Sequence, residues 1–131
     1  HFSMLPNGWI PDDGVDFFKQ FICHLRERWY TECDLVEKDL TTRRNSQFDA
    51  QGRSPELIRQ LAKDAQMLAH HHTVLQFQIT KAKEIAKEVQ SYHQISAQDE
   101  LQNAVVDFAD KVNDRIKQLD QTLRDILQFV S

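Results

Sequence analysis

Residues 54–93 read SPELIRQLAKDAQMLAHHHTVLQFQITKAKEIAKEVQSYH. Ser54 and Pro55 mark a helix start, because a serine oxygen can accept an unpaired backbone N–H and proline at the first helical position has no N–H to leave unpaired. Beyond them, apolar or small residues recur at alternating steps of three and four, which is coiled-coil spacing. The pattern predicts a helix over 54–93 that is about 60 Å long. Its stripe comprises Ile58, Leu61, Ala65, Leu68, His72, Leu75, Ile79, Ala82, Ala86, Val89 and His93.

A second stripe follows a short break at residues 94 and 95. Ser96 and Asp99 are three residues apart, which is close to the capping box that begins many helices. The step from Val112 to Ile116 is four residues where the alternation calls for three, and such a stutter locally relaxes the supercoil. The pattern predicts a helix over 97–130 with the stripe Leu101, Val105, Phe108, Val112, Ile116, Leu119, Leu123, Ile126 and Val130.

The first part of the chain holds a third stripe. Asp12 or Asp13 can cap a helix over 13–44, whose steps around Trp29 show the same stutter, so this helix and the last one can lie side by side with their offsets matched. Polar residues from 41 to 53 predict a loop whose first residues can continue the helix. Residues 1–12 lack a helical period and are interpreted as an N-terminal extension or linker, which can include residues left by cloning. The stripe is Phe18, Ile22, Leu25, Trp29, Cys33, Val36 and Leu40.

Glycine is scarce: the chain has 3 in 131 residues, all of them before the second helix. Average usage is about 7%, so few tight turns can form, and sandwiches, Rossmann folds and phosphate-binding loops are hard to build. Three amphipathic helices bury their stripes most economically as an elongated antiparallel three-helix bundle, an all-α fold over residues 13–131. We expect its core to include Leu25, Trp29, Leu68, His72, Leu75, Ile79, Phe108, Val112, Ile116 and Leu119.

Three stretches of this pattern resemble the spectrin repeat family. In HLRERW at residues 24–29, Trp29 matches the family's tryptophan of the first helix. LAHHHTVL at 68–75 is similar to the family's placement of a histidine midway along the second helix. In VNDRIKQL at 112–119, Ile116 takes the place of an aromatic residue. The resemblance, over roughly residues 15–130, implies a left-handed three-helix coiled coil that serves as a spacer and docking surface in cytoskeletal, scaffold or exchange-factor proteins.

Residues that carry chemistry in other proteins do not form a site in this pattern. His70, His71 and His72 are adjacent, and neighbours on a helix point about 100° apart, so they cannot share a metal ion. Cys23 and Cys33 lie about 15 Å apart along one helix, too far for a disulfide. No nucleotide-binding, metalloprotease or hydrolase motif occurs in the sequence. We therefore expect no catalytic residue, no metal ligand, no cofactor and no enzyme activity.

Among the three histidines, His72 lies on the predicted core stripe, whereas His70 and His71 are expected to face solvent. A buried, uncharged histidine makes stability depend on pH, because the charged form is favoured as the protein unfolds. The replacement His72→Leu is therefore predicted to flatten the change in melting temperature between about pH 7 and pH 5.

Charge is the remaining indicator of partners. A net charge of -4 argues against nucleic acid and anionic lipid, which favour concentrated Lys and Arg. No apolar run approaches the roughly 18 to 20 residues of a membrane-spanning helix. In the helix over 97–130, acids outnumber bases, and Asp107, Asp110 and Asp114 form a candidate face for a basic segment of another protein. The alternative is a solvated surface with i,i+4 pairs between Asp107 and Lys111 and between Asp120 and Arg124.

Three apolar residues of the second helix lie off its main stripe. Val74, Phe77 and Tyr92 either broaden the core or form an exposed apolar patch.

Together these features favour a non-catalytic spacer and protein-interaction module of a larger cytoskeletal or scaffold protein. Its expected partners are other proteins, among them adjacent repeats and cytoskeletal components, with no nucleic acid and no membrane insertion. One alternative is a regulatory bundle next to a catalytic domain, as in Rho-type guanine nucleotide exchange factors, and another is a self-associating bundle. We expect the isolated chain to be monomeric. Reduced cysteines favour the cytoplasm, with cytoskeletal association.

Overall fold

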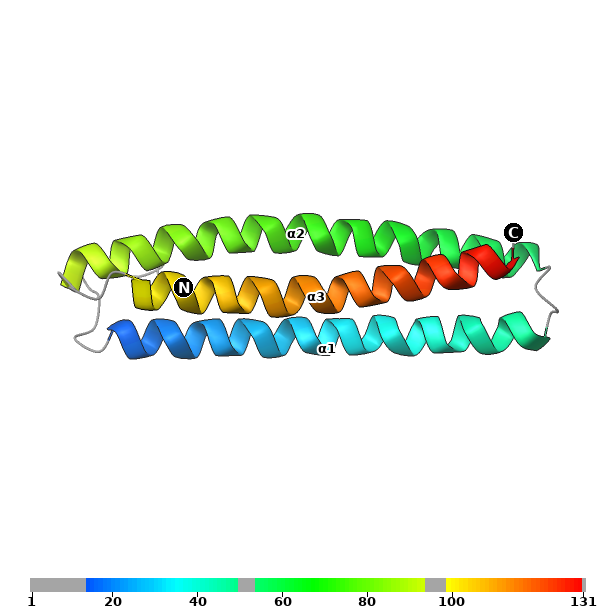
Figure 1. Cartoon of the computed structure of the whole chain (residues 1–131), viewed down its shortest axis with the longest axis horizontal. Helices are drawn as coiled ribbons and strands as arrows, with labels where there is room; N and C mark the ends of the chain where they lie inside the picture. The colour runs from blue at the N-terminus through cyan, green and yellow to red at the C-terminus, as the bar shows by residue number, and fades with distance from the viewer. Residues whose placement is uncertain (1–13, 50–53, 94–98, 131) are drawn as a thin grey trace.

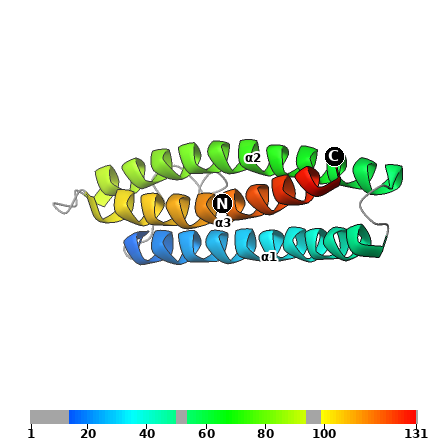
Figure 2. The ribbon, with the colours of Figure 1, turned by 45° about the vertical axis from the view of Figure 1, so that its right-hand side comes forward.

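The computed structural model describes residues 14–49, 54–93 and 99–130. Helix α1 spans Gly14–Asp49, α2 spans Pro55–His93 and α3 spans Asp99–Val130. α2 runs antiparallel to α1 and α3 in one elongated bundle (Figures 1 and 2). Each helix packs against both of the others, and these three segments contain no strand. The predicted all-α antiparallel three-helix bundle is confirmed, while the predicted extension over residues 1–12 lies outside the described residues.

The start of α2 follows the predicted capping chemistry. The backbone N–H of Leu57 donates to Ser54 Oγ at 3.2 Å, and the N–H of Ile58 donates to the carbonyl oxygen of Ser54 at 3.1 Å. The bond to Oγ satisfies a donor that the first turn of a helix otherwise leaves without a partner, and the bond to the carbonyl oxygen is the first i→i−4 bond of the helix.

The predicted stripes of α1 and α3 form the interior of the bundle. Every stripe residue of α1 is buried except Leu25, which is half-buried and packs against the core. In α3 the whole stripe from Leu101 to Ile126 is buried. Expected core residues that the structure buries are Trp29, Leu68, Leu75, Ile79, Phe108, Val112, Ile116 and Leu119.

His72 was predicted in the core, but it is exposed, and His71 is half-buried instead. Residues three and four positions beyond Leu68 point about 100° apart, so they lie on opposite edges of the buried face. Position 71 faces α1, where the Trp29 ring packs against the imidazole. The expected pH effect of a buried His72 therefore loses its basis.

Two other positions near the start of α2 show the same shift by one residue, whereas Leu61 between them is buried as predicted. Leu57 is buried at 2% exposure, whereas Ile58, the predicted stripe residue, is 46% exposed. Asp64 is buried one residue before half-buried Ala65, because Asp64 has an ionic partner on α1.

α1 continues to Asp49, beyond the predicted end at residue 44 and into the predicted loop. Past Leu40, polar side chains take over the inward positions. Arg43 Nε donates to Asp64 Oδ2 of α2 at 3.1 Å, and Gln47 is only 4% exposed. The helix thus remains packed where its apolar residues end, which an apolar periodicity cannot show.

Candidate interaction surface

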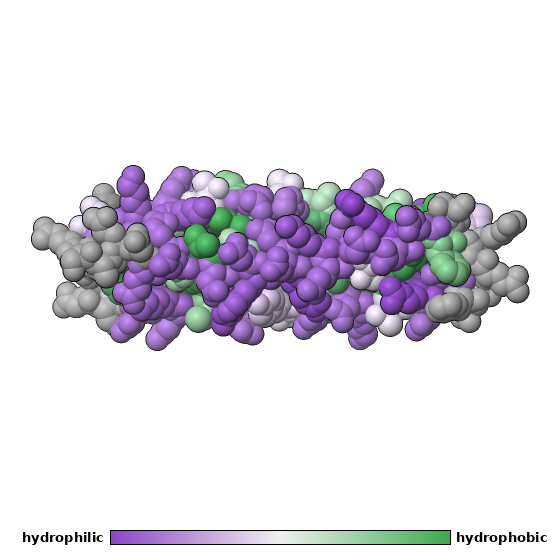
Figure 3. Space-filling model, in the orientation of Figure 1, coloured by the Kyte–Doolittle hydropathy of each residue, from purple (hydrophilic) through white to green (hydrophobic). Residues whose placement is uncertain are grey.

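The three carboxylates of the predicted partner face are all exposed on α3. Asp107 Oδ2 pairs with Lys111 Nζ at 3.2 Å, as the i,i+4 spacing predicted. Within residues 14–49, 54–93 and 99–130, Asp110 and Asp114 have no ion-pair partner. Figure 3 shows the side of the bundle on which α3 lies between α1 and α2, and this side is mostly hydrophilic. The geometry therefore leaves two carboxylates with no cation from the bundle.

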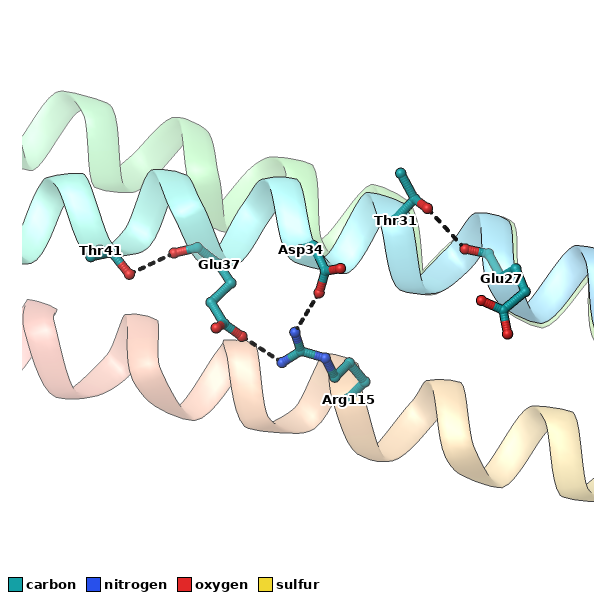
Figure 4. A network of polar contacts seen from close by, with 6 residues as sticks. All are labelled: Glu27, Thr31, Asp34, Glu37, Thr41 and Arg115. Atoms are coloured by element: carbon teal, nitrogen blue, oxygen red, sulfur yellow. Dashed lines mark hydrogen bonds and ion pairs between the residues drawn. The ribbon is translucent and has the colours of Figure 1, made fainter.

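Arg115, next to Asp114, pairs with carboxylates of α1 rather than with the acids of its own helix. Its guanidinium donates to Glu37 Oε2 at 2.6 Å and to Asp34 Oδ1 at 2.8 Å, so one side chain of α3 holds two carboxylates of α1 (Figure 4). The hydrogen bonds to Glu37 and then to Asp34 raise the pKa of Arg115 above its usual value. No sequence pattern indicates this fork, because the spacing of acids and bases on one helix does not reveal contacts with another.

A groove of about 290 Å³ lies between α1 and α2 around Trp29. The ring is 6% exposed, and its Nε1–H donates to Gln78 Oε1 at 2.7 Å. The His71 ring packs edge to face on Trp29 with ring centres 5.9 Å apart. His71 Nε2 is buried without a hydrogen bond, 3.9 Å from Glu32 Oε2. Sequence reasoning found Trp29 here but missed His71 and Gln78.

A larger groove of about 530 Å³ lies between α2 and α3. Buried Leu68 and Ile116 contribute apolar surface to it, and exposed His72 is among its lining residues. Arg124 and Asp120, also in the lining, pair at 3.0 Å, as the sequence predicted.

Of the three apolar residues placed off the α2 stripe, Val74 is half-buried and packs against the core. Phe77 is 63% exposed, and its ring lies 5.6 Å from Lys81 Nζ. The side chain of Tyr92 lies outside the described residues. Val74 therefore broadens the core, whereas Phe77 lies on the surface.

The two cysteines differ in their surroundings, and only Cys33 is shielded from solvent. Cys33 is buried at 1% exposure, and burial raises its pKa, which keeps the thiol protonated and unreactive. Cys23 is exposed, and both cysteines are free. In the described part of the chain no three His, Cys, Asp or Glu side chains gather as metal ligands, and no helix there is long and apolar enough to cross a membrane.

No protein-family model, curated protein or solved structure matches the chain.

Proposed function

We propose that the chain is a non-catalytic spacer and protein-interaction module, a spectrin-like repeat within a larger cytoskeletal or scaffold protein. One observation carries this proposal: α1 begins at one end of the bundle and α3 finishes at the opposite end (Figure 1). Because three antiparallel helices are an odd number, the end of α3 lies one bundle length away from the start of α1. With 32 residues in α3, this length is about 48 Å.

Contacts distributed along the bundle support a role in which the module is pulled along its long axis. α1 and α3 are joined by Lys19 with Glu100 and by Arg115 with two carboxylates, and α1 and α2 by Arg43 with Asp64. These ties and the core run the length of the helices, so an axial pull acts on many contacts together.

The acidic surface of α3 supports the interaction role. Asp110 and Asp114 are separated by four residues and therefore share a face of the helix. A lysine- or arginine-rich helix or extended segment of another protein has the matching charge. Two free cysteines fit a reducing compartment, and the proposed location is the cytoplasm in association with the cytoskeleton.

Force spectroscopy of the full chain tests the spacer role. With handles at its two ends, a folded spacer holds its extension until it unfolds in one step, and residues 14–130 then lengthen by roughly 340 to 370 Å. A Gly/Ser chain of equal length is the control, and it should stretch continuously from low force. Continuous stretching of the protein itself would refute the spacer proposal.

A separate experiment addresses the partner face. Titration with an octalysine peptide, followed by amide NMR shifts, should perturb α3 around Asp110 and Asp114. The double variant Asp110→Asn/Asp114→Asn should reduce these shifts, whereas a matched pair on α2, Glu84→Gln/Glu88→Gln, should not. Equal loss in both variants would mean that the peptide senses only net charge.

A further inference from the structure

In each helix the inward-facing residues are spaced alternately three and four residues apart, and we call this row the seam of the helix. Each seam contains one place where two steps of four residues follow one another. In α1 this phase change is centred on Trp29 and in α3 on Val112, both buried. In α2 it is centred on Leu75, between His71 and Ile79, and it becomes visible only because His71 rather than His72 belongs to the seam. We call Trp29, Leu75 and Val112 the phase layer.

The three phase changes lie at one level of the bundle. Trp29 contacts His71 and Gln78, which flank Leu75 on either side. Gln76 Nε2, next to Leu75, donates to Asn113 Oδ1, next to Val112, at 3.2 Å.

The parallel helices α1 and α3 give the same alignment. Asp34 and Arg115, which hydrogen-bond to one another, are 81 residues apart, as are Lys19 and Glu100. The same offset places Trp29 opposite residue 110, two residues or about 3 Å from Val112.

Polar side chains tie every pair of helices near this level. The Trp29 indole and Gln78 join α1 to α2, and Gln76 and Asn113 join α2 to α3. The Arg115 fork joins α3 to α1 through Asp34 and Glu37, as Figure 4 shows. The planar guanidinium donates in fixed directions, so its contacts with two carboxylates add geometric specificity to the axial position of one helix on another.

When one helix slips along another by one or two turns, seams with alternating steps of three and four bring apolar residues opposite apolar residues again. Several axial alignments therefore have nearly the same free energy. A slip separates the phase changes and breaks the polar ties, and a polar contact at a seam is an effective way to specify register. We propose that the phase layer and its three polar ties form a register lock, which holds the bundle in one of several axial alignments. This inference is independent of the spacer role.

Spin-label distances in the full chain test the lock. Labels at exposed Gln20 of α1 and Gln121 of α3, in a Cys23→Ser background, are separated by about 30 Å along the axis. Cys33, at 1% exposure, stays unlabelled in the folded protein. The labelled protein with all three polar ties intact should give one narrow distance distribution.

The variant Trp29→Phe/Gln76→Ala/Arg115→Met removes the three ties and retains apolar bulk at positions 29 and 115. It should show a second population, displaced by one or two turns, or about 5 to 11 Å. The matched control Lys19→Met/Gln102→Ala removes two interhelical ties away from the layer, Lys19 with Glu100 and Gln102 with the carbonyl oxygen of Lys83, and should keep a single population.

A single unshifted population in the triple variant overturns the proposal, as does an equal shift in the control. If circular dichroism shows that the triple variant does not fold, Arg115→Met alone decides the question. It removes one partly exposed side chain and should show the displaced population at lower occupancy; a single unshifted distance in this variant overturns the lock.

Discussion

Replacement of Trp29 by alanine tests the packing of α1 most sharply. The indole is 6% exposed, it faces both the core and α2, and its Nε1–H donates to Gln78 at 2.7 Å. The change removes the ring, its contact with the His71 ring and the donor to Gln78 at once. All three effects weaken the same interface between α1 and α2.

The magnitude follows from these contacts. Truncation of a buried Phe or Trp to Ala costs about 3 to 5 kcal/mol, which includes the cavity. The part-buried Gln78 carbonyl also loses its donor, which adds about 1 kcal/mol. We expect the free energy of unfolding to fall by about 4 to 6 kcal/mol. Trp29→Phe keeps a ring but not the N–H, and should cost about 1 to 2 kcal/mol.

Urea unfolding followed by circular dichroism measures these changes without relying on the fluorescence of the deleted ring. Leu35→Ala is the matched control, because Leu35 is a large apolar residue of the same helix that is 55% exposed; it should change the free energy by less than about 0.5 kcal/mol. A loss below about 1 kcal/mol for Trp29→Ala would show that the ring does not fill the core.

Three further predictions concern residues that sequence reasoning misplaced or missed, and the two thiols. His72→Ala should change the free energy of unfolding in urea melts by no more than about 0.5 kcal/mol relative to the unsubstituted protein, because the side chain is exposed. A loss above about 1 kcal/mol would show that His72 is buried in the core after all. Asp64→Ala should lower the free energy of unfolding by about 1 to 3 kcal/mol, because it leaves the part-buried Arg43 without its carboxylate. The double variant Asp64→Leu/Arg43→Leu should recover most of that loss. Equal losses in both variants would show that the ion pair is not the cause. Ellman titration of the native protein should detect one fast-reacting thiol, Cys23, and a second only in denaturant, since burial raises the pKa of Cys33; two fast thiols would contradict its burial.

The fold could be predicted because apolar residues set it. The stripes of α1 and α3 alternate clearly between apolar and polar residues, and almost every predicted position is buried. Their common stutter also predicted that the two helices could lie side by side with matched offsets. The contact between Lys19 and Glu100 and that between Asp34 and Arg115 have this parallel offset.

Most of the errors occurred where polar residues occupy inward positions; the one at Leu57 and Ile58 is between two apolar neighbours, which periodicity alone does not distinguish. His71, Asp64 and Gln47 carry no apolar signal, so a hydrophobic pattern passes over them. Their burial depends on partners from another helix, such as Trp29 for His71 and Arg43 for Asp64. Interhelical contacts of this kind cannot be derived from the periodicity of one helix.

The candidate surface was predictable in part for the same reason. Exposed acids on one helix can be read from spacing, and the pair between Asp107 and Lys111 was predicted. The Arg115 fork could not be, because its two carboxylates lie on α1. Its contacts remove one cation from the outer surface of α3 and so sharpen the acidic character of the proposed partner face.

The end-to-end distance of the bundle tests the central claim most directly. Spin labels at exposed Asp16 of α1 and Asp125 of α3, in the Cys23→Ser background, mark the two ends of the rod. With the observed offset of 81 residues between α1 and α3, the labels are about 42 Å apart along the axis. A single narrow distribution at about 40 to 50 Å, unchanged on dilution, is the predicted result. A broad distribution, or one centred below about 25 Å, would contradict a rigid bundle that carries the chain from one end to the other.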